Sequence, residues 1–263
     1  LIMRYYAIAI LLLLTIGIGT AQSIFKEIEK LDPSKNKYSF AILRRNVKEA
    51  KTDLEKAHAL NELAEFHNNS FEKSINGDSA KFYAIQAQQI SQKLIKKGIG
   101  AAHYEALLSR QLIALAAHRK SAPKDSVKVL FYSIKRAAIK QNDLKNLADA
   151  YNNLGILSSV SDSSISYFRK AIRIADSIGF SKVAAYSAKN LSSIVKSRNE
   201  KQHLTKVSLQ AAYSYCNFGY VAQILTNKGK LLLSNSKEDS ALICYNYAIE
   251  LLGNLGFNSK KAS

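Results

Sequence analysis

The side chains best suited to catalysis or metal binding are scattered through this chain and form no known reactive pattern. Its five histidines follow neither an HExxH spacing nor a pairing with cysteine that would hold zinc. They are His58, His67, His103, His118 and His203. Serine is abundant, but no G-x-S-x-G elbow is present. The carboxylates lie mainly at expected helix starts or on polar faces, so none is paired for acid–base catalysis. We therefore expect no catalytic residue, no metal site and no cofactor.

The two cysteines, Cys216 and Cys244, each lie among apolar and aromatic residues, in YSYCNF and ALICYNYA. An exported protein could join them in a disulfide. Two buried thiols that act as small apolar side chains are the simpler interpretation, because no helical spacing forces the two together. Both interpretations stay open at this stage.

The first 21 residues have the layout of a secretory signal peptide. Arg4 supplies a positive charge, the run from Ala7 to Ile18 is apolar, and Gly19-Thr20-Ala21 offers a cleavage site. The apolar run is short for a membrane span, which needs about 20 residues. An uncleaved anchor is the alternative to a cut after Ala21. We therefore expect an exported protein, on the periplasmic or extracytoplasmic face of a bacterial inner membrane.

The overall composition favours long helices and a basic surface. The chain has 263 residues with 38 Lys and Arg, 20 Asp and Glu, and only two prolines. So few helix breakers disfavour a β-protein with many turns. A formal net charge of +18 would suit nucleic acid. Export would remove the protein from that partner, so we expect a solvated lysine surface that binds no nucleic acid.

A period of 37 residues runs through the second half of the chain. The asparagines at positions 153, 190 and 227 are spaced by 37, and the small residues Gly155, Ser192 and Gly229 share that register. A sustained period of this length indicates stacked supersecondary units. Apolar residues recur every three or four positions within Leu147–Leu157 and again within Asp162–Ile178. Each unit is therefore expected to be a helix A, a turn and a helix B.

Asp-Ser pairs recur at positions 78, 125, 162 and 239, where each is expected to begin a helix B. The carboxylate or hydroxyl would accept a hydrogen bond from a free backbone N–H of the first turn. The negative charge would also suit the positive end of the helix dipole. An O-glycosylation acceptor of exported bacterial proteins is the alternative interpretation of these pairs.

The segments YNNLG (151–155) and YFRKAI (167–172) resemble the tetratricopeptide repeat. Tyr151, Leu154 and Gly155 match its first helix, and Phe168 and Ala171 match its second. The family's repeat has about 34 residues. The resemblance covers roughly residues 47 to 255 and implies an all-α, right-handed α-solenoid of antiparallel helix pairs. With the signal peptide at 1–21, we expect a helical lead-in at 22–46 and about five degenerate helix pairs over 47–263.

The resemblance also implies that the A helices line a concave, peptide-binding surface. The residues expected on it are Asp149, Asn152, Ile156, Tyr186, Lys189, Ser193, Lys196, Gln223, Thr226 and Lys230. Its lysines would suit an acidic or C-terminal peptide segment. The two-carboxylate clamp of chaperone-binding repeats is not matched. A solvated polar face without a partner is the alternative.

A leader followed by such repeats is similar to the sensory part of bacterial signalling proteins, in which an exported array precedes a membrane helix and an output domain. This similarity implies a non-catalytic protein- or peptide-interaction scaffold, joined to the membrane only by a segment absent from this chain. We expect the reading frame to continue beyond Ser263, because LGF at 255–257 repeats the turn IGF at 178–180. The alternatives are a free-standing exported structural or assembly scaffold, and an enzyme with an unrecognised site.

Overall fold

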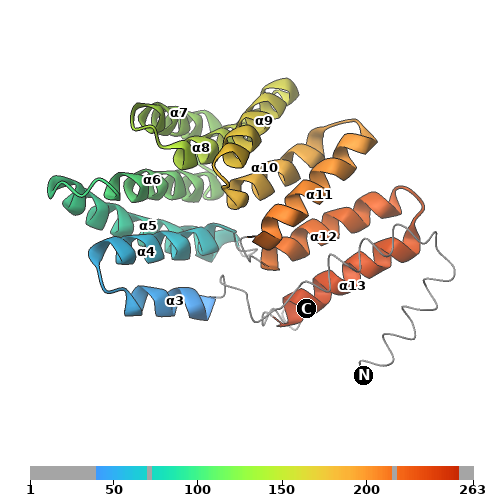
Figure 1. Ribbon diagram of the computed structural model, residues 1–263, viewed down its shortest axis with the longest axis horizontal. Coiled ribbons are helices and arrows are strands. Elements are labelled where there is room, and N and C mark those ends of the chain that lie inside the picture. Colours follow the sequence, from blue (N-terminus) through green and yellow to red (C-terminus); the bar gives the residue numbers. More distant parts are fainter. Residues whose placement is uncertain (1–39, 70–72, 215–217, 255–263) are drawn as a thin grey trace. The chain divides into compact units, whose positions relative to one another are not determined.

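The computed structural model describes residues 40–69, 73–214 and 218–254, and every regular element in these ranges is an α-helix (Figure 1). The chain divides into two compact units. The larger unit spans Lys37–Tyr215 and contains α3 to α11, whereas α12 and α13 belong to the smaller unit. The expectation of an all-α repeat fold is confirmed for these residues.

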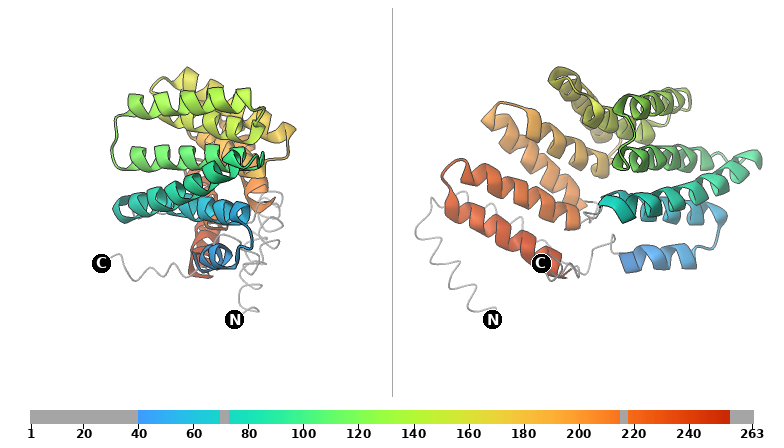
Figure 2. Two further views of the ribbon diagram at one scale, coloured as in Figure 1. Left: turned by 90° about the vertical axis from the view of Figure 1, so that its left-hand side faces the viewer. Right: turned by 180° about the vertical axis from the view of Figure 1, so that it is seen from behind.

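After the short helix α3 (Phe40–Glu49), the helices follow one another as A and B partners. The pairs are α4 (Asp53–Asn69) with α5 (Lys73–Lys96), α6 (Ala102–Arg119) with α7 (Lys124–Lys140), α8 (Leu144–Leu157) with α9 (Ser161–Ser177), α10 (Ser181–Ile194) with α11 (Arg198–Ser214), and α12 (Phe218–Leu233) with α13 (Glu238–Asn254). Each helix packs on its partner, and in the larger unit successive pairs stack on one another (Figure 2). No described helix has the length and continuous apolarity that crossing a bilayer requires.

Five turns in the described residues share one geometry, a left-handed residue just beyond the end of a helix. These residues are Gly98, Ser121, Asn142, Gly179 and Ser236, with φ between 51° and 80°. In each turn the next N–H reaches back across the helix end, as Phe180 N–H does to the Ala175 carbonyl at 2.8 Å. This is the Schellman arrangement, which satisfies carbonyls that the ending helix leaves open. The turn that recurs along the described chain therefore lies just beyond the C-terminal ends of its helices.

The prediction that the Asp-Ser pairs cap helices through side-chain hydrogen bonds is wrong for the pairs that the structure resolves in detail. Asp125 and Asp162 lie within the first turns of α7 and α9, and neither helix has a side-chain cap hydrogen bond. Asp78 lies inside α5, where its carboxylate pairs with Lys120 at 2.6 Å. The acids at positions 125, 162 and 239 do stand in first turns, where the helix dipole favours negative charge.

Other residues cap the A helices. The Asp143 carboxylate accepts a hydrogen bond from the Asn146 backbone N–H at 3.0 Å at the start of α8. At the start of α4, the Thr52 hydroxyl accepts from the Glu55 N–H, and the Glu55 carboxylate accepts from the Thr52 N–H, both at 3.1 Å. The second arrangement is a capping box.

The glycines of the 37-residue register are explained by helix packing. A Cβ placed on Gly155 of α8 would lie 2.6 Å from the Phe168 ring of α9, and one on Gly229 of α12 would lie 2.8 Å from the Tyr245 ring of α13. Neither position has room for a methyl group, because the aromatic ring of helix B lies directly against the backbone of helix A. The repeat therefore couples a small residue on one helix to a ring on the next.

Some sequence predictions fall on residues outside those described. The signal peptide at 1–21 and most of the lead-in are among them, as is Cys216. Cys244 on α13 is fully buried, which fits a small apolar side chain. The alternative of a disulfide with Cys216 stays open, because Cys216 lies outside the described residues.

Candidate functional site

The A helices of the larger unit contact one another through buried amides. The Asn61 amide on α4 donates to the Glu105 carboxylate on α6 at 2.8 Å, and the Gln111 amide on α6 donates to the Asn146 side chain on α8 at 2.7 Å. The Asn152 side-chain oxygen on α8 accepts from two side chains of α10, Ser187 at 3.1 Å and Asn190 at 3.2 Å. We call this series the amide ladder. It joins α4, α6, α8 and α10 in one row.

A buried charge links the first and the last helix of this row. The Lys182 ammonium of α10 is 3.0 Å from the Glu65 carboxylate of α4 and 3.9 Å from the Asp149 carboxylate of α8. The three side chains are between 11% and 15% exposed. Packed helix axes lie about 8 to 10 Å apart, so a flat row would keep α4 and α10 beyond the reach of one side-chain pair. The row must therefore curve, with the A helices on its inner side.

Burial and charge act against each other in this cluster. Burial alone would lower the pKa of Lys182, but the facing Glu65 and Asp149 carboxylates outweigh it and hold that pKa well above its ordinary value. Burial raises the pKa of Asp149 to about 6, although the Lys182 charge opposes the rise. Asp149 also keeps one buried carboxylate oxygen without a hydrogen bond. Lys182 is therefore charged, and Asp149, one of the two carboxylates that face it, is poorly solvated.

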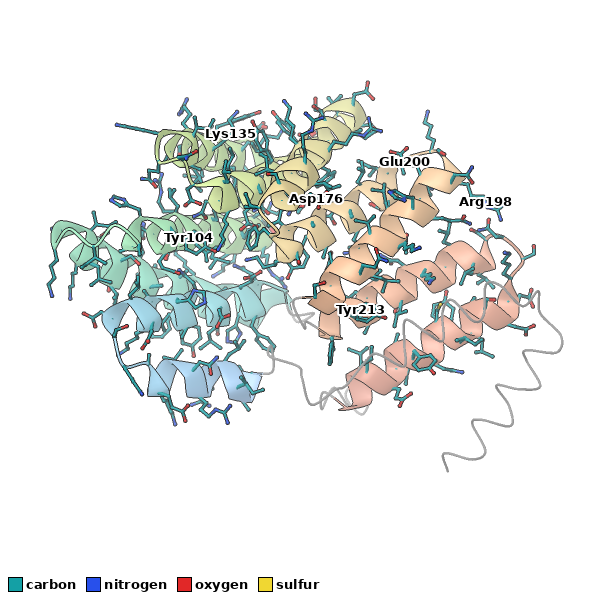
Figure 3. The ribbon with its side chains drawn as sticks, in the orientation of Figure 1. Tyr104, Lys135, Asp176, Arg198, Glu200 and Tyr213 are labelled. Carbon is teal, nitrogen blue, oxygen red and sulfur yellow. The ribbon has the colours of Figure 1, made fainter. Side chains whose placement is uncertain are left out.

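A rim of larger polar side chains surrounds this centre. Tyr104 of α6, labelled in Figure 3, is largely buried, and burial raises the pKa of its hydroxyl. The Lys145 ammonium of α8 lies 5.6 Å from the centre of the Tyr104 ring. His58 and Glu62 lie on α4, and His58 is half exposed. We call this rim and the Lys182 centre together the inner charged face.

His58 and Glu105 are the one pairing here that resembles part of a catalytic site. The His58 Nδ1 lies 2.9 Å from the Glu105 carboxylate, and this hydrogen bond raises the pKa of the imidazole. A hydroxyl nucleophile would complete such a site. The nearby Ser109 hydroxyl is fully buried and is engaged by the Asn61 side chain and the Glu105 carbonyl. It therefore cannot meet a substrate. Among the described residues, no group of three or more His, Cys, Asp or Glu is placed to hold a metal ion.

The structure distributes the residues expected on the concave surface over both units. Asp149 and Asn152 are buried, being 8% and 5% exposed, so they hold helices together and cannot form an open surface as expected. Tyr186 and Lys189 are partly buried on α10, and burial lowers the pKa of Lys189.

The remaining expected residues are more accessible. Ser193 and Lys196 are exposed at the end of α10 and just beyond it, and Ile156 on α8 is 44% exposed. Gln223 and Thr226 are partly buried on α12, and Lys230 is exposed there. The structure brings the α8 and α10 positions together through the amide ladder. The α12 positions belong to the smaller unit.

Sequence reasoning missed the charged residues of the inner face. Glu65, Glu105 and Lys182 belong to none of the sites expected from the sequence, and His58 was expected to have no catalytic or metal-binding role. The sequence did contain a sign of them, since Glu65 and Glu105 each lie on an A helix among residues whose apolar spacing predicts burial. Their partners lie far away in sequence, however, and the pairing follows only from the curvature of the stack.

No family model matches the chain, and no curated protein matches it in sequence. Solved structures match its fold. A Rap protein, in a crystal structure complexed with Competence and Sporulation Factor, is similar over 83% of this chain and 70% of its own, with a TM-score of 0.51 and 14% identity. BtubC (BKLC) from P. vanneervenii is similar over 88% of this chain and 93% of its own, with a TM-score of 0.53 and 13% identity. The likeness is one of fold, a helical repeat of the tetratricopeptide-like kind.

Proposed function

We propose that this protein is a non-catalytic scaffold that binds a protein or peptide segment on its inner charged face. The observation that carries the proposal is the convergence of four A helices on Lys182, because each supplies a charged or polar side chain to one place. Contacts that only hold the helices together would not require partly exposed charged groups such as Glu62 and Lys145 at the rim. The fold of the Rap protein, solved with Competence and Sporulation Factor, adds support.

The inner charged face carries both signs of charge. Lys145 at its rim is exposed and Glu62 is partly exposed, whereas Glu65, Asp149 and Lys182 pair mainly with one another. A partner segment with both acidic and basic groups fits this face better than the acidic or C-terminal segment that the sequence suggested. Charged groups of this kind give specificity and faster association more than raw affinity.

A selection from a random peptide library tests the proposal. Peptides selected on the full chain should bind a Glu62→Ala/Lys145→Ala variant at least about tenfold more weakly, a loss of about 1.4 kcal/mol. An Arg173→Ala variant, changed on an exposed position of α9, should bind them as the wild type does. Peptides that bind all three proteins equally would exclude the inner charged face as the binding surface.

We further propose an exported, sensory role, in which partner binding is passed to an output domain across a membrane. The support is the leader-like sequence at 1–21 together with the similarity of leader and repeats to exported sensory arrays. N-terminal sequencing of the exported product should begin at Gln22. Recovery of the protein with an intact leader in the cytosol would contradict export. A free-standing exported scaffold is the alternative role for the same binding face.

A further inference from the structure

The B helices α7 and α9 each contain a long stretch of sequence with several basic residues and no acid. The sequence holds no Asp or Glu between Ser126 and Asn142, nor between Ser163 and Ala175. These stretches carry the cations Lys128, Lys135, Arg136, Lys140, Arg169, Lys170 and Arg173. Arg169 pairs with Glu200 of α11 at 2.9 Å. Within the described residues, Arg136, Lys140 and Arg173 form no ion pair and are exposed.

The same side of α7 exposes aliphatic and aromatic side chains. Val129 is 63% exposed, Ile139 is 56% exposed and Tyr132 is 36% exposed. With Arg136 and Lys140 they are spaced by three or four residues, so they share one stripe of the helix. The buried residues of α7 lie opposite, at Val127, Phe131, Ile134 and Ala138. We call the stripe of Val129, Tyr132, Arg136, Ile139 and Lys140 the outer stripe.

A tyrosine–lysine cluster joins the outer stripe to α9. The Tyr132 and Tyr167 hydroxyls lie 3.1 Å apart, and the Tyr167 ring is 6.0 Å from the Tyr151 ring of α8. The Lys135 ammonium, labelled in Figure 3, lies 5.3 Å from the Tyr132 ring centre and 5.7 Å from that of Tyr151. Lys170 lies 5.7 Å from the same Tyr151 ring. Two ammonium groups thus converge near one ring without a carboxylate between them.

We propose that the outer stripe and the cations of α9 dock on the surface of an anionic lipid bilayer. Basic residues would lie at the phosphates, each adding attraction to an anionic surface. Val129 and Ile139 would enter the boundary between headgroups and acyl chains, and Tyr132 suits that boundary because one end of its ring is polar. A nucleic acid backbone or an acidic protein segment would satisfy the cations but leave the exposed aliphatic groups without apolar contact.

Cosedimentation of the full chain with vesicles tests this proposal. The vesicles are phosphatidylcholine alone or phosphatidylcholine with anionic phosphatidylglycerol. The quantity compared between variants is binding to the anionic vesicles divided by binding to the phosphatidylcholine vesicles. The apolar leader is common to every variant, so its contribution cancels in comparisons between variants. Wild-type protein should prefer the anionic vesicles, and salt should weaken that preference by screening.

Arg136→Gln/Lys140→Gln should lower this ratio about 30-fold. Each cation near an anionic surface contributes about 1 kcal/mol of binding free energy, and about 1.4 kcal/mol corresponds to a tenfold change in affinity. The matched control is Lys51→Gln/Lys56→Gln, which removes two exposed cations near the start of α4 and should leave the ratio within about threefold of wild type. Val129→Ser/Ile139→Ser should weaken binding at high salt, where the apolar contribution remains. Circular dichroism confirms that each variant is folded.

Equal ratios for wild type and the Arg136→Gln/Lys140→Gln variant would overturn the proposal. So would tighter binding to single-stranded DNA or polyglutamate than to anionic vesicles, if Val129→Ser/Ile139→Ser left that binding unchanged. The peptide selection tests the inner charged face through Glu62 and Lys145, which are not part of the outer stripe, so failure of one proposal does not decide the other.

Discussion

Lys182 and Glu65 form an ion pair at 3.0 Å although 117 positions separate them in the chain. The two side chains belong to the fourth and the first A helix of the larger unit. α4 packs on α3, α5 and α6, whereas α10 packs on α8, α9 and α11. One long side chain thus links helices that otherwise pack with different neighbours. We infer that this ion pair helps to set the curvature of the stack and, with it, the geometry of the inner charged face.

Removing the lysine should destabilise the larger unit strongly. Lys182→Met keeps most of the side-chain volume but leaves the Glu65 and Asp149 carboxylates buried without their cation. Breaking a buried pair in this way costs about 3 to 5 kcal/mol. Chemical denaturation followed by circular dichroism measures the change in the free energy of unfolding.

A matched control for this variant is Lys120→Met. It removes the ion pair of Lys120 with Asp78, which is shorter at 2.6 Å but has side chains that are 50% and 66% exposed. Exposed pairs contribute about 0 to 1 kcal/mol because water competes for both charges. A loss at Lys182 no larger than that at Lys120 would mean that the buried pair does not hold the stack.

Asp149 should make the protein less stable as pH rises through the weakly acidic range. Burial raises its folded-state pKa to about 6 from an ordinary 3.8, so the folded protein retains a proton that the unfolded chain releases between those values. Stability from this group is therefore present at low pH and lost as pH rises from about 4 to about 6. Glu65, Tyr104, Asp143 and Lys182 are the other titratable groups that act on it.

Asp149→Asn isolates this effect. The variant should be more stable than wild type by roughly 1 to 3 kcal/mol at neutral pH, since each pKa unit corresponds to about 1.4 kcal/mol. Its advantage should vanish near pH 4, where wild-type Asp149 is protonated. Denaturation at a series of pH values measures the difference, and a difference that is constant across the series contradicts the assignment.

Gly155→Ala should destabilise the larger unit in spite of the higher helix propensity of alanine. The new methyl would meet the Phe168 ring at 2.6 Å, and overpacking of this kind costs about 1 to 3 kcal/mol. Gly253→Ala on α13 is the control, because nothing lies within 4 Å of a Cβ there. It should stabilise by up to about 1 kcal/mol through helix propensity. Thermal unfolding compares the two; a neutral Gly155→Ala would show that the contact relaxes freely.

The amide ladder predicts that removing one of its buried hydrogen-bond acceptors lowers the free energy of unfolding. Asn152→Leu removes the oxygen that accepts from Ser187 and Asn190, leaving the Ser187 hydroxyl buried without that acceptor. An unsatisfied buried group costs about 1 to 3 kcal/mol. Ser193→Ala changes an exposed hydroxyl three residues beyond Asn190 and should stay within about 0.5 kcal/mol of wild type. Similar unfolding energies for the two variants would argue against the ladder.

The repeat fold could be read from the sequence because its signals are local. Apolar spacing within Leu147–Leu157 predicts α8, and the register of Gly155 and Gly229 reports contacts between neighbouring helices. The inner charged face could not be read in this way, because Glu65, Asp149 and Lys182 meet only through the sum of small rotations between pairs. The sequence predicts the side of α8 on which Asp149 and Asn152 lie, but it also predicts that this side is an open surface. Contacts between A helices bury them instead.

Hydrogen exchange of the wild-type chain with and without a library-selected peptide tests the central claim most directly. The peptide should slow amide exchange in α4, α6, α8 and α10, with the largest effect around Glu62 and Lys145, because those helices carry the inner charged face. Exchange in α5, α7 and α9 should change much less. Protection confined to these B helices, with the A helices unaffected, would contradict the claim that the inner charged face binds the partner.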